Sequence, residues 1–213
     1  MTAAAIHTTG LEPLHVALPP GRSLRMDAGD LSDEDFLAIC THNPDLRIER
    51  APAGQNIIIM SPTGSETGAF NSAIHIEIGI WNRLHKSGVT FDSSTGFALP
   101  NGAYRSPDTA WVRKERWLAL SLEERRRFAP IAPDFVVELR SEGQSMEELH
   151  AKMAEYMACG CRLGWLIDPS ARLTHVYAGS ETPDGSVVVV PFDQPLSGGE
   201  LMPGLTVTLA ELA

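Results

Sequence analysis

Three acidic residues stand in sequence contexts that suggest chemistry rather than ordinary surface charge. Glu138 lies inside the apolar run 135–139, Asp108 directly follows Pro107, and Glu66 lies in a stretch rich in Ser, Thr and Gly. Burying an unpaired carboxylate costs on the order of several kcal/mol. Glu138 must therefore have a cation, a hydrogen-bond donor or a solvent pocket beside it.

Two of these carboxylates could form a metal site. Carboxylates at the ends of neighbouring strands supply hard oxygen ligands for Mg²⁺, which keeps several waters and needs only one or two protein carboxylates. A metal-bound water would then be the nucleophile. Two simpler interpretations stay open. Glu138 could form a buried salt bridge to Arg140 or Arg162. Pro107 and Asp108 could simply form a turn or end an edge strand.

The spacing of these residues is more specific than any one of them. Asp108 precedes Glu138 by 30 residues, and Arg140 follows Glu138 by two. Because side chains alternate along a strand, Arg140 is expected on the same strand face as Glu138. The combination of an acid after proline with a later acid and base two residues apart is therefore more specific than Pro107 with Asp108 alone.

Periodicity predicts the elements that position these residues. A capping signal at Ser32 predicts a short helix over 32–41, and helical spacing from Phe70 predicts a long helix that stops at Gly88. Turn signals at 51–54 predict a hairpin of 46–50 and 55–60. Further predicted strands are 89–92, 95–99, 105–112 with a break at Pro107, 163–167, 173–177 and 187–190.

The run 135–139 is too apolar for a strand with one solvent-exposed face, so it is predicted to be an interior strand of the sheet. A capping box at Ser145 opens a helix that Gly160 ends, and residues 113–127 are typical of short surface helices. We expect an extended or disordered arm over 1–23. The rest, 24–213, is predicted to be a single α/β domain with a mixed β-sheet.

Four motifs together carry a resemblance to a known family. SPTGSETGAFN, YRSPDTAWV, PDFVVELRS and the helix containing KMAEYMACGCRLGWLIDP resemble the Uma family of restriction endonucleases, a branch of the PD-(D/E)xK phosphodiesterase superfamily. The similarity runs from about Ser32 to the last strands. It implies a restriction-endonuclease-like core, a mixed β-sheet flanked by helices, with Mg²⁺ or Mn²⁺ held between the Asp and the Glu.

The resemblance also implies roles for individual residues. Asp108 matches the Asp of the PD motif, Glu138 matches the (D/E) position, and Glu66 matches the acid often supplied by the first core helix. The sequence departs from the pattern at the lysine, where Arg140 stands. Arginine does not release its proton, so it can steady phosphate charge but cannot act as a base.

In this family a lysine of the following helix takes that role, and Lys152 is the matching residue. Helical spacing stacks Lys152 with Leu149 and Tyr156, at the border of the apolar stripe, so it could reach towards Glu138. The alternative is a surface lysine paired with Glu148 or Glu155.

The expected function is that of a metal-dependent DNA endonuclease. Glu66, Asp108 and Glu138 would position the metal, and Lys152 with Arg140 would stabilise the developing charge. One alternative is a catalytically inert nuclease-like fold that serves as an interaction or scaffold protein. Another is a hydrolase that uses a carboxylate pair without metal, which leaves the cationic neighbours unexplained.

The charge and residue composition of the chain narrow the range of functions and compartments that we expect. With 17 Lys and Arg against 27 Asp and Glu, the net charge of −10 disfavours a generic nucleic-acid binder. It does not exclude a metal-dependent nuclease, because metal-binding carboxylates count as negative until the ion arrives. The sequence shows neither a membrane span nor a secretory signal, and its three cysteines favour a reducing compartment, so we expect a cytoplasmic protein. A homodimer or larger assembly is expected, because two-fold pairing could align two sites along a duplex.

Overall fold

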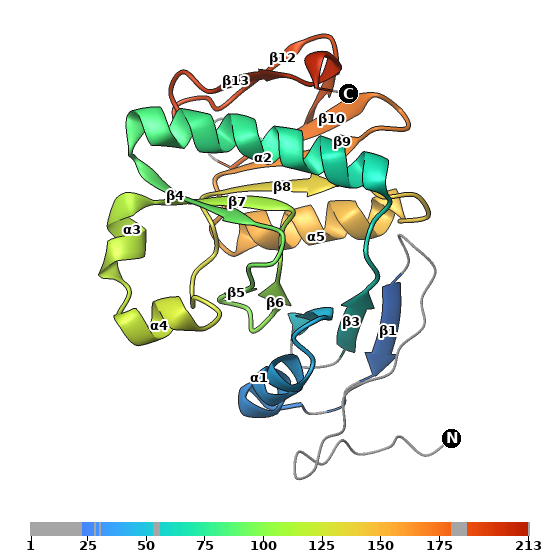
Figure 1. Cartoon of the computed structure of the whole chain (residues 1–213), viewed down its shortest axis with the longest axis vertical. Helices are drawn as coiled ribbons and strands as arrows, with labels where there is room; N and C mark the ends of the chain where they lie inside the picture. Colours follow the sequence, from blue (N-terminus) through green and yellow to red (C-terminus); the bar gives the residue numbers. More distant parts are fainter. Residues whose placement is uncertain (1–22, 28, 30, 53–55, 180–186, 213) are drawn as a thin grey trace.

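A mixed six-stranded β-sheet forms the centre of the computed structural model, in the order β11-β10-β9-β8-β7-β4 (Figure 1). Strands β8 and β9 run parallel and the other neighbours pair antiparallel. The strands are β4 (Gly88–Asp92), β7 (Thr109–Arg113), β8 (Phe135–Leu139), β9 (Leu163–Asp168), β10 (Leu173–Ala178) and β11 (Val187–Pro191). The interior position of β8 confirms the prediction from its apolar sequence.

The structure describes residues 23–27, 29, 31–52, 56–179 and 187–212. The arm predicted for 1–23 therefore lies outside the described residues, apart from Ser23, which begins a strand. The single domain predicted for 24–213 stays a prediction. No helix in the described part of the chain is long and apolar enough to span a bilayer.

Two long helices cover the two faces of the central sheet, α2 (Ser65–His85) on one side and α5 (Met146–Ala158) on the other (Figure 1). Because side chains alternate along β8, Phe135 and Val137 join the core cluster under α2, whereas Val136 joins the cluster under α5. The same alternation turns Glu138 towards α5. The acid on this buried strand thus faces the helix that carries Lys152.

A second, antiparallel sheet lies beside this core, in the order β1-β3-β2-β6-β5. Helix α1 (Asp33–His42) covers it with Phe36 and Ile39 and begins after Ser32, whose side chain accepts from the Asp35 N–H. The hairpin of β2 and β3 and the helix after Ser32 are as predicted. The strands are β1 (Ser23–Asp27), β2 (Arg47–Arg50), β3 (Asn56–Met60), β5 (Phe97–Ala98) and β6 (Tyr104–Arg105).

The chain passes from one sheet to the other at Ser106, Pro107 and Asp108. Strand β6 pairs with β2 of the smaller sheet, and β7 pairs with β8 of the central sheet. Proline has no N–H to give to a ladder, so it suits the break between two strands. Asp108 is therefore fixed at the junction of the two sheets.

The remaining elements extend the core at its edges. Short helices α3 and α4 confirm the prediction for 113–127, and the C-terminal strands pack over α2 (Figure 1). These elements are α3 (Lys114–Ala119), α4 (Leu122–Arg126), β12 (Pro195–Ser197), β13 (Thr206–Thr208) and the 3₁₀ turn η2 (Leu209–Glu211).

The end of α2 differs from its prediction. The helix ends at His85, and Lys86 takes a left-handed conformation with φ 55°, so Gly88 does not cap it. Gly88 instead opens β4, where an added Cβ would lie 2.3 Å from the Trp111 ring and 2.4 Å from the Val112 carbonyl oxygen. Close packing against β7, rather than helix capping, requires glycine at this position.

This packing predicts that Gly88→Ala lowers the free energy of unfolding by about 1–3 kcal/mol, because backbone and a buried ring must shift to admit the methyl group. The matched control is Gly79→Ala in α2, where an added Cβ meets nothing within 4 Å. That change should raise stability by up to about 1 kcal/mol. Urea unfolding of both variants is the measurement, and equal stability of the two would contradict the packing argument.

Candidate active site

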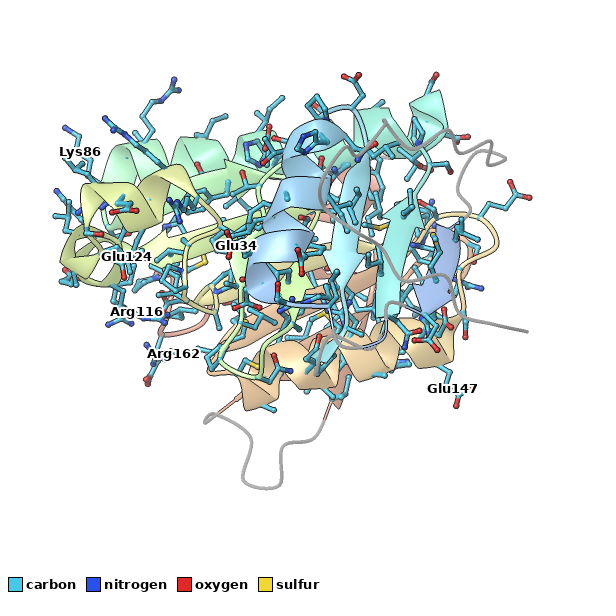
Figure 2. The ribbon with its side chains drawn as sticks, turned by 90° about the horizontal axis from the view of Figure 1, so that it is seen from below. Glu34, Lys86, Arg116, Glu124, Glu147 and Arg162 are labelled. Atoms are coloured by element: carbon cyan, nitrogen blue, oxygen red, sulfur yellow. The ribbon has the colours of Figure 1, made fainter. Side chains whose placement is uncertain are left out.

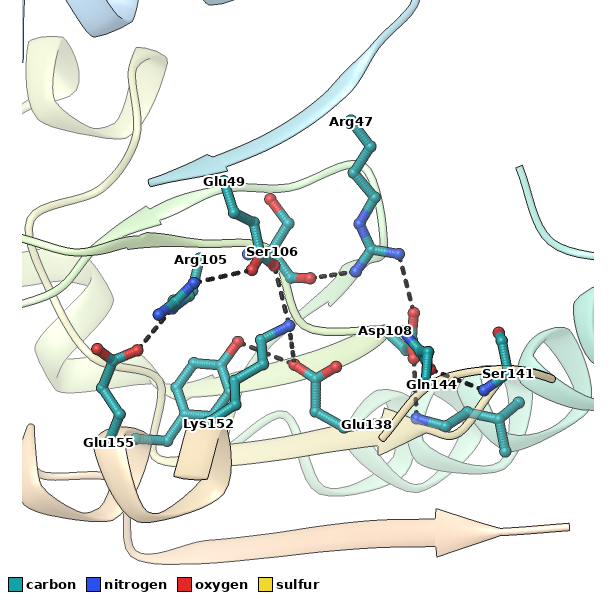
Figure 3. Close-up of polar contacts among 12 residues, drawn as sticks. Arg47, Glu49, Arg105, Ser106, Asp108, Glu138, Ser141, Gln144, Lys152 and Glu155 are labelled. Atoms are coloured by element: carbon teal, nitrogen blue, oxygen red, sulfur yellow. Dashed lines mark hydrogen bonds and ion pairs between the residues drawn. The ribbon is translucent and has the colours of Figure 1, made fainter. Parts of the chain in front are cut away.

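Asp108 and Glu138 come together at the edge where β7 begins and β8 ends. Thr109 pairs with Val137, so the residues next along each strand, Asp108 and Glu138, are neighbours. Both line a cavity of about 240 Å³, together with Arg47 and Lys152 (Figure 3). The structure thus joins two of the predicted metal ligands and the predicted lysine at one cavity.

Asp108 is held at both of its oxygens. Oδ2 accepts the Leu139 N–H at 2.8 Å, which fixes the carboxylate to the end of β8. Oδ1 accepts from Arg47 Nη1 at 3.0 Å, and the same guanidinium donates to the Ser106 carbonyl. Arg47 is a contact that the sequence did not predict.

Glu138 is 4% exposed and makes its polar contacts through one oxygen. Oε1 accepts from the Tyr156 hydroxyl at 2.9 Å and pairs with Lys152 Nζ at 2.8 Å, which leaves Oε2 for a ligand. Burial is the main cause that raises the pKa of Glu138 to about 7, with Lys152 opposing the shift and Asp108 adding to it. Its carboxyl therefore changes charge near neutral pH.

Lys152 is buried and doubly paired, with a side chain that is 13% exposed. Its Nζ contacts Glu138 and also Glu49 Oε1, at 2.9 Å. Burial disfavours the ammonium, but the two carboxylates outweigh it and raise the pKa of Lys152. Lys152 is therefore an ammonium ion inside the site, rather than a surface lysine.

Glu49 is the residue that the sequence reasoning missed. Its side chain is 3% exposed, and its carboxylate accepts from the Ser106 N–H at 3.0 Å and from Arg105 Nη1 at 3.2 Å. Although burial opposes ionisation, Lys152 and Arg105 lower its pKa to about 2. In the sequence, Glu49 stands between Ile48 and Arg50 and looks like any charged residue of a hairpin strand, so no sequence signal marked it.

The polar network carries one more negative than positive group. Arg105 Nε also pairs with Glu155 of α5 at 2.5 Å, so the cationic members are Arg47, Arg105 and Lys152. The acidic members are Glu49, Asp108, Glu138 and Glu155. With every group ionised, this partly closed site would carry a net charge of −1, which attracts a further cation.

Glu66 and Arg140 lie together at a neighbouring cavity of about 580 Å³. Glu66 is exposed in the first turn of α2. Arg140, just past the end of β8, donates through Nη1 to Asp168 at 2.7 Å and to the Ser170 hydroxyl at 3.3 Å. The structure therefore places these two predicted site residues at a different cavity from the one that Asp108, Glu138 and Lys152 line.

The donor set of the smaller cavity fits a hard divalent cation. Within the residues that the structure describes, no group of three or more His, Cys, Asp or Glu side chains is arranged as a metal cage. Mg²⁺ does not need such a cage, because it is held by one or two carboxylates, water and substrate phosphate. Asp108 and Glu138 provide that number of carboxylates, one half-buried and one buried, beside an excess negative charge.

Comparisons with known proteins agree with this geometry. No curated protein matches the chain in sequence. A solved structure, titled "Crystal structure of a putative nuclease belonging to DUF820 from Anabaena variabilis", matches with a TM-score of 0.64 and 21% sequence identity. The match covers 78% of this chain and 88% of that one. At this identity the likeness shows the fold, and it confirms the predicted restriction-endonuclease-like core.

The sequence also matches a family directly. The Uma2 family, described as "Putative restriction endonuclease", matches residues 33–210, which is most of the chain. This agrees with the resemblance carried by the motifs around Glu66, Asp108 and Glu138. The chain belongs to the Uma2 family.

Proposed function

We propose that this protein hydrolyses DNA phosphodiester bonds with the help of Mg²⁺ or Mn²⁺. The observation that carries the proposal is that Asp108 and Glu138 lie side by side at one partly closed cavity, with the Lys152 ammonium 2.8 Å from Glu138. Membership of a family described as restriction endonucleases and the nuclease fold support a nuclease. The metal, the DNA substrate and the residue roles are the proposal.

Asp108 and Glu138 would hold the cation, which when bound lowers the pKa of a water and supplies positive charge to the phosphate. Lys152 would place its ammonium beside the reacting phosphate and stabilise the charge that develops there. Arg47 lines the same cavity, and its buried Nε has no hydrogen-bond partner among the described residues. We infer that the Arg47 guanidinium adds positive charge beside the phosphate of the substrate.

The positions of Glu66 and Arg140 support a narrower metal set than the sequence pattern implies. We assign the cation to Asp108 and Glu138 and leave Glu66 outside the set. Arg140, fixed by Asp168 at the adjoining cavity, would contact the DNA backbone beyond the scissile phosphate. A homodimer remains our expectation, because two-fold pairing would align two such cavities along a duplex.

One observation favours the inert scaffold as a second candidate. Asp108 and Glu138 are already paired with Arg47 and Lys152, so the acids have partners even without a metal. Such a site could be kept for folding alone. Metal binding and cleavage, tested separately, distinguish the two candidates.

The raised pKa of Glu138 predicts how metal affinity depends on pH. Below a pKa of about 7 the carboxyl holds a proton that a metal must displace, so Mn²⁺ affinity should fall by roughly tenfold per pH unit; above it the affinity should level off. Calorimetric titration with Mn²⁺ between pH 5.5 and 8.5 measures this.

The double variant Asp108→Asn with Glu138→Gln should lose Mn²⁺ binding at every pH. Asp168→Asn, which changes a buried carboxylate of the neighbouring cavity, should retain it. Unchanged Mn²⁺ binding in the double variant would remove these two residues from the metal site.

Cleavage is tested by nicking of supercoiled plasmid with Mn²⁺ at fixed salt. Lys152→Met should reduce the rate by roughly the 10²- to 10⁴-fold of a lost catalytic proton or charge group. It should also cost about 3–5 kcal/mol of stability, because it leaves the buried Glu138 carboxylate without its cation and Glu49 with Arg105 alone. The assay is therefore run well below the melting temperature of each variant.

The outcome of this assay assigns the cationic role. Loss of cleavage in Glu138→Gln together with full activity in Lys152→Met would move that role to Arg140, for which Arg140→Gln is the further test. A wild-type protein no faster than Glu138→Gln, with several metals and DNA forms, would favour the scaffold.

A further inference from the structure

We propose that Glu49 is the positioning residue of Lys152, which holds the ammonium in place when a metal occupies Glu138. This inference rests on the proposed nuclease function and adds a residue that the PD-(D/E)xK pattern does not contain. Glu49 is the second carboxylate that pairs with Lys152, and it lies on β2 of the smaller sheet.

Lys152 Nζ lies between two carboxylates on different elements. Glu49 Oε1 on β2 is 2.9 Å from it, and Glu138 Oε1 on β8 is 2.8 Å from it (Figure 3). Glu138 lines the proposed metal cavity, whereas Glu49 lines a different cavity with Arg105 and Glu155. The two acids therefore hold the same ammonium, and only Glu138 faces the metal cavity.

Glu49 is itself held rigidly. Its Oε1 accepts from the Ser106 N–H and its Oε2 from Arg105 Nη1. Arg105 is fixed in turn by Glu155, which lies one turn after Lys152 on α5. The contacts close a ring from α5 through β2 and β6 back to α5, so Glu49 has little freedom to follow the lysine if the lysine moves.

Once a divalent cation binds, the two carboxylate partners of Lys152 would differ in how strongly they hold its ammonium. The cation shares the charge of Glu138 and repels the ammonium beside it, because like charges in a partly buried site interact strongly. Glu138 can then no longer hold Lys152 alone. Glu49, which does not line that cavity, would keep its full compensating charge and hold the ammonium in place.

A merely structural role for Glu49 is the competing interpretation, since the same ring joins the two sheets. The two roles differ in how Glu49 couples to Lys152 in catalysis. If Glu49 acts through Lys152, removing its charge matters only while the lysine is present. If it serves the fold, its removal has the same effect with or without the lysine.

The experiment compares kcat for wild type, Glu49→Gln, Lys152→Met and the double variant in the Mn²⁺ nicking assay. Glu49→Gln should lower kcat by roughly 10²-fold, the cost of a displaced catalytic group, with KM little changed. In the Lys152→Met background, Glu49→Gln should cost nothing further. A double variant slower than Lys152→Met by the full single-variant factor overturns the inference.

The matched control is Asp33→Asn. Asp33 forms an ion pair with Arg50, the next residue along β2, and takes no part in the site. This variant should leave kcat unchanged. If Glu49→Gln fails to fold, the comparison of Lys152→Met with the double variant still decides, because neither protein contains the Lys152 ammonium; a double variant slower than Lys152→Met then overturns the inference.

A second readout is independent of activity, and the sequence makes it simple. The chain has three lysines, and Lys86 and Lys114 are exposed on the surface (Figure 2 labels Lys86). With ¹⁵N-lysine, the Lys152 ammonium should give a distinct, slowly exchanging signal that persists on titration with Mg²⁺. In Glu49→Gln the signal should exchange rapidly once Mg²⁺ is added.

The two parts of the account fail in different ways. A wild-type protein without cleavage activity removes the nuclease proposal, and the NMR titration still tests the position of Lys152. Cleavage that persists in Glu49→Gln at the wild-type kcat removes the inference and leaves the nuclease proposal standing. A Lys152 signal that is equally protected in Glu49→Gln and wild type with Mg²⁺ also overturns the inference.

Discussion

A buried ammonium between two carboxylates is the interaction on which the rest of this structure depends. Lys152 cannot be buried without compensation, and Glu49 and Glu138 supply it from two different sheets. This pairing links α5 to the central sheet through Glu138 and to the smaller sheet through Glu49. Asp108 is placed beside Glu138 by the register of β7 and β8 and by the Leu139 N–H, so strand pairing and one charge balance together build the site.

The same balance leaves room for one more cation. Glu138 can take a proton, pair with the Lys152 ammonium or bind a metal, and its burial is the main reason that its pKa lies near 7. The network has four acids and three bases, so a divalent ion would relieve an excess negative charge rather than create a positive one. Part of the acidic character of the chain thus belongs to the site. A net charge of −10 is therefore compatible with a DNA substrate that binds together with metal.

The sequence predicted most of the fold and the centre of the site, because burial leaves a local pattern. The apolar run around Glu138 identified an interior strand, and helical spacing turned Lys152 inward. Pairing between distant segments leaves no such pattern. Glu49 could not be distinguished from an exposed strand residue, and the turn of Arg140 towards Asp168 depends on how β9 ends. Strands β1, β12 and β13 were missed because their short sequences form strands only beside their partners.

The most direct test of the central claim is anomalous diffraction from crystals of the protein soaked in Mn²⁺ at pH 8, where Glu138 has lost its proton. The account predicts an anomalous peak between Asp108 and Glu138, at about 2.0–2.2 Å from a carboxylate oxygen of each, in the range for small octahedral divalent ions. Lys152 should remain in contact with Glu49. A peak beside Glu66 or Asp168, or no peak while Mn²⁺ binding is saturated in solution, would contradict the account.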